Sequence, residues 1–129
     1  MEMKIHWIRY LGAGLSALVI LFLALDAGMK IIGAAASVTA TGQLGFRPDL
    51  VPILGWILAI ATVLYAVPKT SSLGAVLLTG YLGGAVAVQF QHGAPLATHV
   101  LFGVYLGTLA WSGLWLRSEG LQAVLPVSR

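Results

Sequence analysis

Cysteine is absent from the 129-residue sequence, and charged side chains are scarce, with seven Lys or Arg and four Asp or Glu. The lack of cysteine excludes a disulfide framework, thiol redox catalysis, an iron–sulfur cluster and any zinc site with cysteine ligands. Charged residues make up 9% of the chain, whereas soluble domains average roughly 25%. Hydrophobic residues make up 59%, so the composition predicts a protein that folds inside a membrane.

The apolar residues gather in four long stretches, at residues 10–32, 50–67, 73–90 and 97–116. A membrane-spanning helix needs ~20 mostly apolar residues. The sequence therefore predicts an all-α protein, a four-helix transmembrane bundle that forms a single domain over residues 1–129. Little chain lies outside the four stretches, so we expect the lipid bilayer as the medium and no soluble catalytic domain, phosphate-binding loop or nucleic-acid partner.

The first stretch follows Lys4 and Arg9 and so also resembles a signal peptide. Its apolar run is longer than the ~7 to 15 residues of a signal-peptide core, and Asp26 and Lys30 separate it from the small residues at 34–36. We expect it to stay in place as a signal anchor.

Basic residues indicate the orientation of the chain. One side of the predicted bundle carries most of them, namely Lys4, Arg9, Lys69, Arg117 and Arg129. Because Lys and Arg are enriched on the cytoplasmic side of membrane proteins, we expect both termini to be cytoplasmic. Residues 33–46 have low polarity but are not apolar enough for another span, and they are expected to form a short helix on the outer surface.

Glycine spacings suggest how two of the helices pack. Gly80 and Gly84 are four residues apart in the third stretch, and Gly103 and Gly107 repeat this spacing in the fourth. Small residues four apart let two helix backbones approach closely in lipid, where apolar burial alone gives no attraction. Packing of these two helices within the bundle is favoured over dimerisation, and the oligomeric state stays open.

Four polar side chains fall within the predicted spans at similar depth. Asp26 and Lys30 lie four residues apart on one helical face, in the order that favours an ion pair. Gln89 ends the third span and His99 begins the fourth, near the same outer level. A charge inside a membrane is costly, and when it is present it points to a functional site. The alternative is that Asp26 and Lys30 neutralise each other near the headgroups.

These four residues are predicted to line a ligand pocket open to the outer leaflet, with Phe22, Leu82 and Phe102 lower down. Gln91 and His92 are expected just above it, in the loop between the third and fourth helices. No metal site is expected, because His92 and His99 are separated by a loop with Pro95 and His6 belongs to the opposite side. No resident cofactor is expected either.

Several stretches resemble the DoxX-like family of membrane proteins, a branch of the wider DoxX family. They are LDAGMK at 25–30, LGFRPDLVPILG at 44–55, LYAVPKT at 64–70, LGAVLLTGYLGGAVA at 73–87, HVLF at 99–102 and WSGLWLR at 111–117. Where the family commonly has a Thr-His pair after the third-helix Ala-Val-Ala run, this chain has Val88 and Gln89. The resemblance implies a four-helix protein of the bacterial inner membrane, and the wider family is associated with membrane oxidoreductase systems, including thiosulfate-quinone chemistry.

Three functions are compatible with these observations. The first is an accessory or small subunit of a membrane oxidoreductase or stress-response system, with a membrane or redox protein partner and a quinone-type or other lipid-like ligand. The second is a small enzyme that uses Asp26 and His99 as an acid and base on a hydrophobic substrate. A transporter is disfavoured, because no chain of ionisable residues continues from the outer layer to the cytoplasmic side.

Overall fold

The computed structural model describes residues 2–125, and this part of the chain contains helices and no strand. Its longer helices are α1 (Glu2–Ile31), α3 (Val51–Ala66), α4 (Ser71–His92) and α5 (Phe102–Arg117), and its shorter ones are α2 (Ala35–Gln43), η1 (Pro48–Leu50), η2 (Leu96–Val100) and α6 (Glu119–Val124). Four segments in the described part are long and apolar enough to cross a membrane: His6–Ile31, Pro48–Ala66, Ser71–His92 and Leu96–Arg117. The all-α fold with four spanning helices is confirmed.

The structural boundaries differ from the predicted spans at their polar ends. Helix α1 begins at Glu2 instead of residue 10, because hydropathy detects only the apolar part of a helix that continues through its polar first turns. Helix α4 runs on to His92 and ends at Gly93, whose φ of 78° gives a left-handed cap that favours glycine. Helix α6 was not expected, and the short helix α2 lies within the predicted 33–46 segment.

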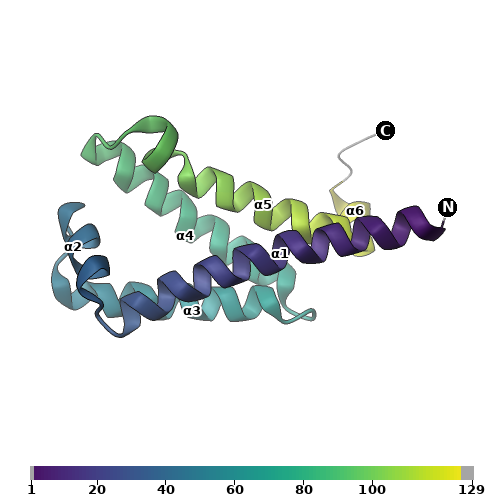
Figure 1. Cartoon of the computed structure of the whole chain (residues 1–129), viewed down its shortest axis with the longest axis horizontal. Coiled ribbons are helices and arrows are strands. Elements are labelled where there is room, and N and C mark those ends of the chain that lie inside the picture. Colours follow the sequence, from purple (N-terminus) through teal and green to yellow (C-terminus); the bar gives the residue numbers. More distant parts are fainter. Residues whose placement is uncertain (1, 126–129) are drawn as a thin grey trace.

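The helices form a closed ring in which α1 packs on α3 and α5, and α4 also packs on α3 and α5. Figure 1 shows the start of α1 and helix α6 at one end of the molecule, here called the terminal end, and α2 at the other, called the α2 end. Buried apolar residues recur every three or four positions on each helix, as one face of a helix requires. They are Val19, Leu23 and Ala27; Leu58, Ala61 and Tyr65; Ala75, Leu78 and Leu82; and Leu106, Ala110 and Leu114.

Close backbone contacts at the terminal end join α1 to α5 and α3 to α4. A Cβ on Gly12 would lie 2.8 Å from the Gly113 carbonyl oxygen, and one on Gly113 would lie 2.6 Å from Ser16 Oγ. A Cβ on Gly74 would overlap the backbone of Tyr65. Glycine is required at these positions because any side chain would force the helices apart.

At the α2 end the helices pair differently. A Cβ on Gly55 of α3 would lie 2.8 Å from Lys30 Cβ on α1, and one on Gly103 of α5 would lie 3.0 Å from the Leu82 carbonyl oxygen on α4. The α1–α3 pair and the α4–α5 pair are thus each held together, and Figure 1 shows the two pairs diverging towards the α2 end. This divergence leaves room for a cavity between them.

The four glycines of the predicted contact between the third and fourth spans have different surroundings. Helices α4 and α5 do pack together, and Gly103 makes the close approach, whereas a Cβ on Gly107 would lie at an ordinary 3.9 Å from Leu82 Cδ1. Gly80 and Gly84 do not approach another helix, because a Cβ on either would have no neighbour within 4 Å. Both glycines instead line the cavity.

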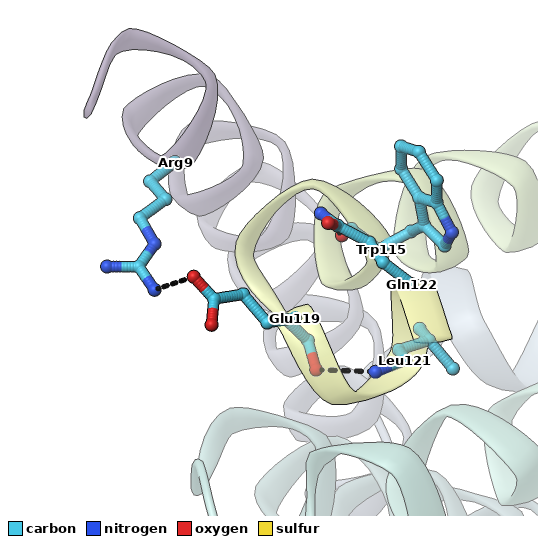
Figure 2. A network of polar contacts seen from close by, with 6 residues as sticks. Arg9, Trp115, Glu119, Leu121 and Gln122 are labelled. Carbon is cyan, nitrogen blue, oxygen red and sulfur yellow. Dashed lines mark hydrogen bonds and ion pairs between the residues drawn. The ribbon is translucent and has the colours of Figure 1, made fainter. Parts of the chain in front are cut away.

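Helix α6 folds back at the terminal end and is held by polar contacts (Figure 2). The Ser118 hydroxyl accepts a hydrogen bond from Leu121 N at 3.2 Å, and Gln122 donates to the Trp115 carbonyl at 2.7 Å. Arg9 of α1 reaches Glu119 at 3.3 Å. Exposed ion pairs are worth only about 0–1 kcal/mol, so the ion pair adds little to the two hydrogen bonds in holding α6.

Candidate functional site

A cavity of about 510 Å³ lies where the two helix pairs diverge. Its walls come from α1, α4, η2 and α5 with Leu54 of α3. Residues 40–46, here called the α2 segment, supply Ala40, Thr41, Leu44 and Phe46 to the wall towards the α2 end. Small-molecule sites in proteins commonly have volumes of ~300 to 1,000 Å³ and apolar walls with a few polar groups. The cavity has the size and character of such a site.

All four predicted polar residues line this cavity: Asp26, Lys30, Gln89 and His99. Helix α1 supplies the first two, α4 supplies Gln89 near its end, and η2 supplies His99. The four residues were predicted to share a depth, and in the structure they also face one space. Their role in binding a ligand stays a prediction.

Asp26 and Lys30 form an ion pair across one turn of α1. Lys30 Nζ donates to Asp26 Oδ1 at 2.6 Å, and the side chains are 34% exposed for Asp26 and 14% for Lys30. The pair cancels most of the charge that each group alone would bring into the membrane. An ammonium has three donors and a carboxylate has several acceptor positions, so both groups keep capacity to bond a ligand.

His99 is positioned by an unusual turn. Helix η2 is a π-helical turn after Pro95, in which the Pro95 carbonyl accepts from both His99 N at 3.0 Å and Val100 N at 3.1 Å. Such wide turns are rare and often occur at functional sites. The hydroxyl of Thr98 contacts His99 Nδ1 at 2.8 Å, which leaves the other ring nitrogen, Nε2, as the one available to a ligand.

Aromatic and aliphatic side chains form the deeper part of the cavity. The rings of Phe22 and Phe102 lie 5.3 Å apart at 59° and join α1 to α5, and Leu82 lies beside them on the cavity wall. These are the three residues predicted to line the lower part of the pocket. The cavity is thus polar near the α2 end and apolar below.

The structure corrects the placement of two polar residues. Gln91 and His92 form the last turn of α4 instead of a loop, and they line an open hollow of about 580 Å³ that adjoins the cavity and shares Leu44, Phe46 and Val88 with it. Two tyrosines of α4 and α5 have different surroundings. Tyr81 lines the cavity. The Tyr105 hydroxyl instead donates to the Ala97 carbonyl at 2.9 Å and supports the η2 turn.

The sequence analysis missed a buried polar network nearer the terminal end. The Tyr65 hydroxyl donates to the Ala110 carbonyl at 2.6 Å and lies 2.8 Å from Ser16 Oγ, which accepts from Arg117 Nε at 3.1 Å. Because Tyr65 uses its one hydrogen on Ala110, Ser16 must donate to Tyr65. A tyrosine near the end of a long apolar stretch was the available signal, since a buried phenol needs a partner, but the partners lie far away in sequence.

Among residues 2–125 no three His, Asp or Glu side chains gather closely enough to hold a metal ion. What the polar end of the cavity provides is hydrogen-bonding capacity, from the Lys30 ammonium, the Asp26 carboxylate, the Gln89 amide and the His99 imidazole. These groups can bind and orient oxygen-bearing head groups, and a histidine and a carboxylate can also transfer protons.

Fold and site together define a small multi-pass membrane protein, with a ligand-sized cavity between diverging helix pairs. The model of the DoxX-like family matches residues 14–113. The chain therefore belongs to the DoxX-like family, and the matched segment includes every residue that lines the cavity. The comparisons with curated proteins and with solved structures gave no match.

Proposed function

We propose that this DoxX-like protein binds a lipid-like, quinone-type molecule in the cavity between its helix pairs. In this proposal it serves as an accessory or small subunit of a membrane oxidoreductase or stress-response system. One observation supports it most strongly: Asp26, Lys30, Gln89 and His99 all line one cavity whose remaining wall is mainly apolar.

The chemistry of the lining suits an amphiphile with an oxygen-bearing ring. Carbonyl or hydroxyl oxygens on a head group would accept from Lys30 and Gln89 and would exchange a hydrogen bond with His99 Nε2. The ring and the start of a hydrocarbon tail would lie against Phe22 and Phe102, where aromatic packing and apolar burial are favourable. The bound molecule would carry the electrons, and a larger membrane or redox protein would exchange them.

Removing the polar groups should weaken binding of a defined probe. With the protein in phosphatidylcholine nanodiscs, we expect Asp26→Asn and His99→Gln each to weaken occupancy by a benzoquinol with a saturated tail roughly tenfold. The hydroxyls of this probe can donate to the Asp26 carboxylate and exchange a hydrogen bond with His99, and a hydrogen bond to a charged group is worth about 1.5–3 kcal/mol. Native mass spectrometry at increasing mole fractions of probe measures the occupancy.

His92→Gln is the matched control, because His92 lines the adjoining hollow and does not line the cavity. It should bind the probe as the wild type does. Equal occupancy in the wild type, Asp26→Asn and His99→Gln would show that the polar residues do not bind the head group.

The alternative is a small enzyme in which Asp26 and His99 act as acid and base on a hydrophobic substrate. It is supported by the presence of both side chains on one cavity. Binding is favoured over this role because the Asp26 carboxylate is already engaged by Lys30 at 2.6 Å, whereas the hydrogen-bonding capacity that remains on both groups suffices to hold a head group. Purification separates the two functions: a stable larger partner supports the subunit, and turnover of the bound molecule by the isolated bundle supports the enzyme.

We also propose that the terminal end faces the cytoplasm of a bacterial cell and that the protein lies in the inner membrane. The support is charge, since Arg9, Lys69 and Arg117 belong to this end and basic residues mark the cytoplasmic side. The sequence contains no cysteine, so a maleimide that reacts with thiols labels only the cysteine that is introduced. In intact cells a membrane-impermeant maleimide should label a cysteine at Arg47 and spare one at Lys69; the reverse pattern would invert the topology.

A further inference from the structure

Two glycines leave part of the α4 wall of the cavity without side chains. Gly80 and Gly84 are four residues apart and therefore lie on one face of the helix. Both line the cavity and both are exposed, and a Cβ on either would meet nothing within 4 Å. Two residues that belong to a cavity and are also exposed mark a place where the cavity opens to the outside.

The depth of this opening decides what it faces. Helix α4 runs from Ser71 to His92, and at 1.5 Å per residue Gly80 and Gly84 lie about 14 and 20 Å from its start, close to the middle of the helix. The hydrocarbon core of a bilayer is ~30 Å thick. An opening near mid-span faces acyl chains, and a molecule that passes through it comes from the lipid.

Protein covers part of the route towards water. Four residues of the α2 segment line the cavity, of which Thr41 is buried, Leu44 and Phe46 are half-buried and Ala40 is exposed. The polar residues lie on this side, with Gln89 about 8 Å along α4 from Gly84 at 1.5 Å per residue. A head group among the polar residues is therefore within reach of a tail that leaves the cavity at the glycines.

We propose that Gly80 and Gly84 form a lateral entrance through which a tailed, membrane-soluble ligand enters from the bilayer, and that the tail stays in this opening when the head group is bound. The inference rests on the proposed function and narrows its ligand class to amphiphiles with a hydrocarbon tail. Glycine is suited to this place because it leaves the opening free of side chains.

Photolabelling tests the position of the tail directly. The probe is a benzoquinone with a diazirine at the middle of a saturated tail, added to the full-length protein in phosphatidylcholine nanodiscs. We expect cross-links on α4 near Gly80 and Gly84 and on the facing part of α3, and an excess of unlabelled tailed benzoquinone should remove them. Competed cross-links confined to residues 40–46 and 91–92 would overturn the proposal, because they would mean entry from the water side.

Substitutions provide the second measurement. Leucine at 80 or 84 (Gly80→Leu, Gly84→Leu) should lower the apparent affinity for the tailed benzoquinone roughly ten- to hundredfold, as expected for overfilling a site. Gly83→Leu is the matched control: Gly83 is on the same helix, has equally open surroundings and does not line the cavity. Equal affinities in all three variants and the wild type would refute the entrance.

The two levels of the proposal fail in different ways. If the wild type shows no labelling that unlabelled benzoquinone can compete away, the proposed quinone-type ligand and the lateral entrance are both wrong. If the wild type is labelled competitively but Gly84→Leu binds as Gly83→Leu does, the ligand stands and the entrance alone is wrong. Unchanged thermal unfolding of the variants shows that the bundle has kept its fold.

Discussion

Replacing Gly74 with alanine should destabilise the protein by about 3 kcal/mol or more, a cost at the upper end of that for overpacked sites. The added Cβ would overlap the backbone nitrogen and Cα of Tyr65. A flexible side chain could turn away, but backbone cannot move without separating α3 from α4. Equilibrium unfolding of the purified protein in mixed micelles, titrated with sodium dodecyl sulfate, measures the change.

Gly83→Ala is the control for this substitution. Gly83 also lies on α4, with no atom within 4 Å of an added Cβ, and alanine in a helix is favoured over glycine by about 0.5–1 kcal/mol. The control should therefore be neutral or slightly stabilising. Equal stabilities of Gly74→Ala and Gly83→Ala would mean that α3 and α4 do not meet at this contact.

Tyr65→Ala should cost about 3–5 kcal/mol, as the loss of a large buried aromatic side chain does. Tyr65 is 0% exposed and is the largest fully buried side chain in the described part of the chain. Tyr65→Phe keeps the ring and removes the hydroxyl, which leaves the Ala110 carbonyl and Ser16 without their partner. We expect it to cost about 1–3 kcal/mol, so the two variants separate the ring from its hydrogen bonds.

Tyr105→Phe provides a comparison for Tyr65→Phe. Its hydroxyl also donates to a backbone carbonyl, that of Ala97, but the side chain is exposed. A lost hydrogen bond at a more accessible site should cost less, about 0.5–1.5 kcal/mol. If Tyr65→Phe lowered the free energy of unfolding no more than Tyr105→Phe does, the buried network would add no more stability than an exposed hydrogen bond.

These two sites explain why the bundle opens at one end only. Gly74 and Tyr65 join α3 to α4, and the Tyr65 network ties α1, α3 and α5 together through Ser16 and Ala110. The guanidinium of Arg117 adds a contact 5.7 Å above the Tyr65 ring, an attraction worth about 0.5–2 kcal/mol. A closed terminal end and a diverging α2 end give a cavity that ends inside the bundle.

Much of this arrangement was predictable from the sequence because lipid imposes strong rules. A hydrocarbon solvent allows few structures besides helices, so four apolar stretches determine the fold class. The cost of charge in lipid also limits where Asp26 and Lys30 lie, and counting residues along each helix brings Gln89 and His99 to the same level. Depth was therefore predictable from helix geometry alone.

The direction in which each residue points around its helix axis was less predictable. Gly80 and Gly84 have a spacing typical of helix contacts, but the close approaches occur at Gly12, Gly55, Gly74, Gly103 and Gly113. A motif spacing fixes which residues share a face and leaves open which neighbour that face meets. The π-helical turn at η2 adds a residue to one turn and changes the direction of His99, and regular helical periodicity does not predict such a turn.

Native mass spectrometry of the protein released from native membrane patches, without detergent, tests most directly whether the cavity is a binding site for a membrane-soluble molecule. We expect the wild type and His92→Gln to carry one discrete adduct that fragments as a ring-bearing, tailed amphiphile, and the double variant Asp26→Asn/His99→Gln to lack it. A wild type without any discrete adduct, or the same adduct at the same occupancy in the double variant, would contradict a ligand site at this cavity.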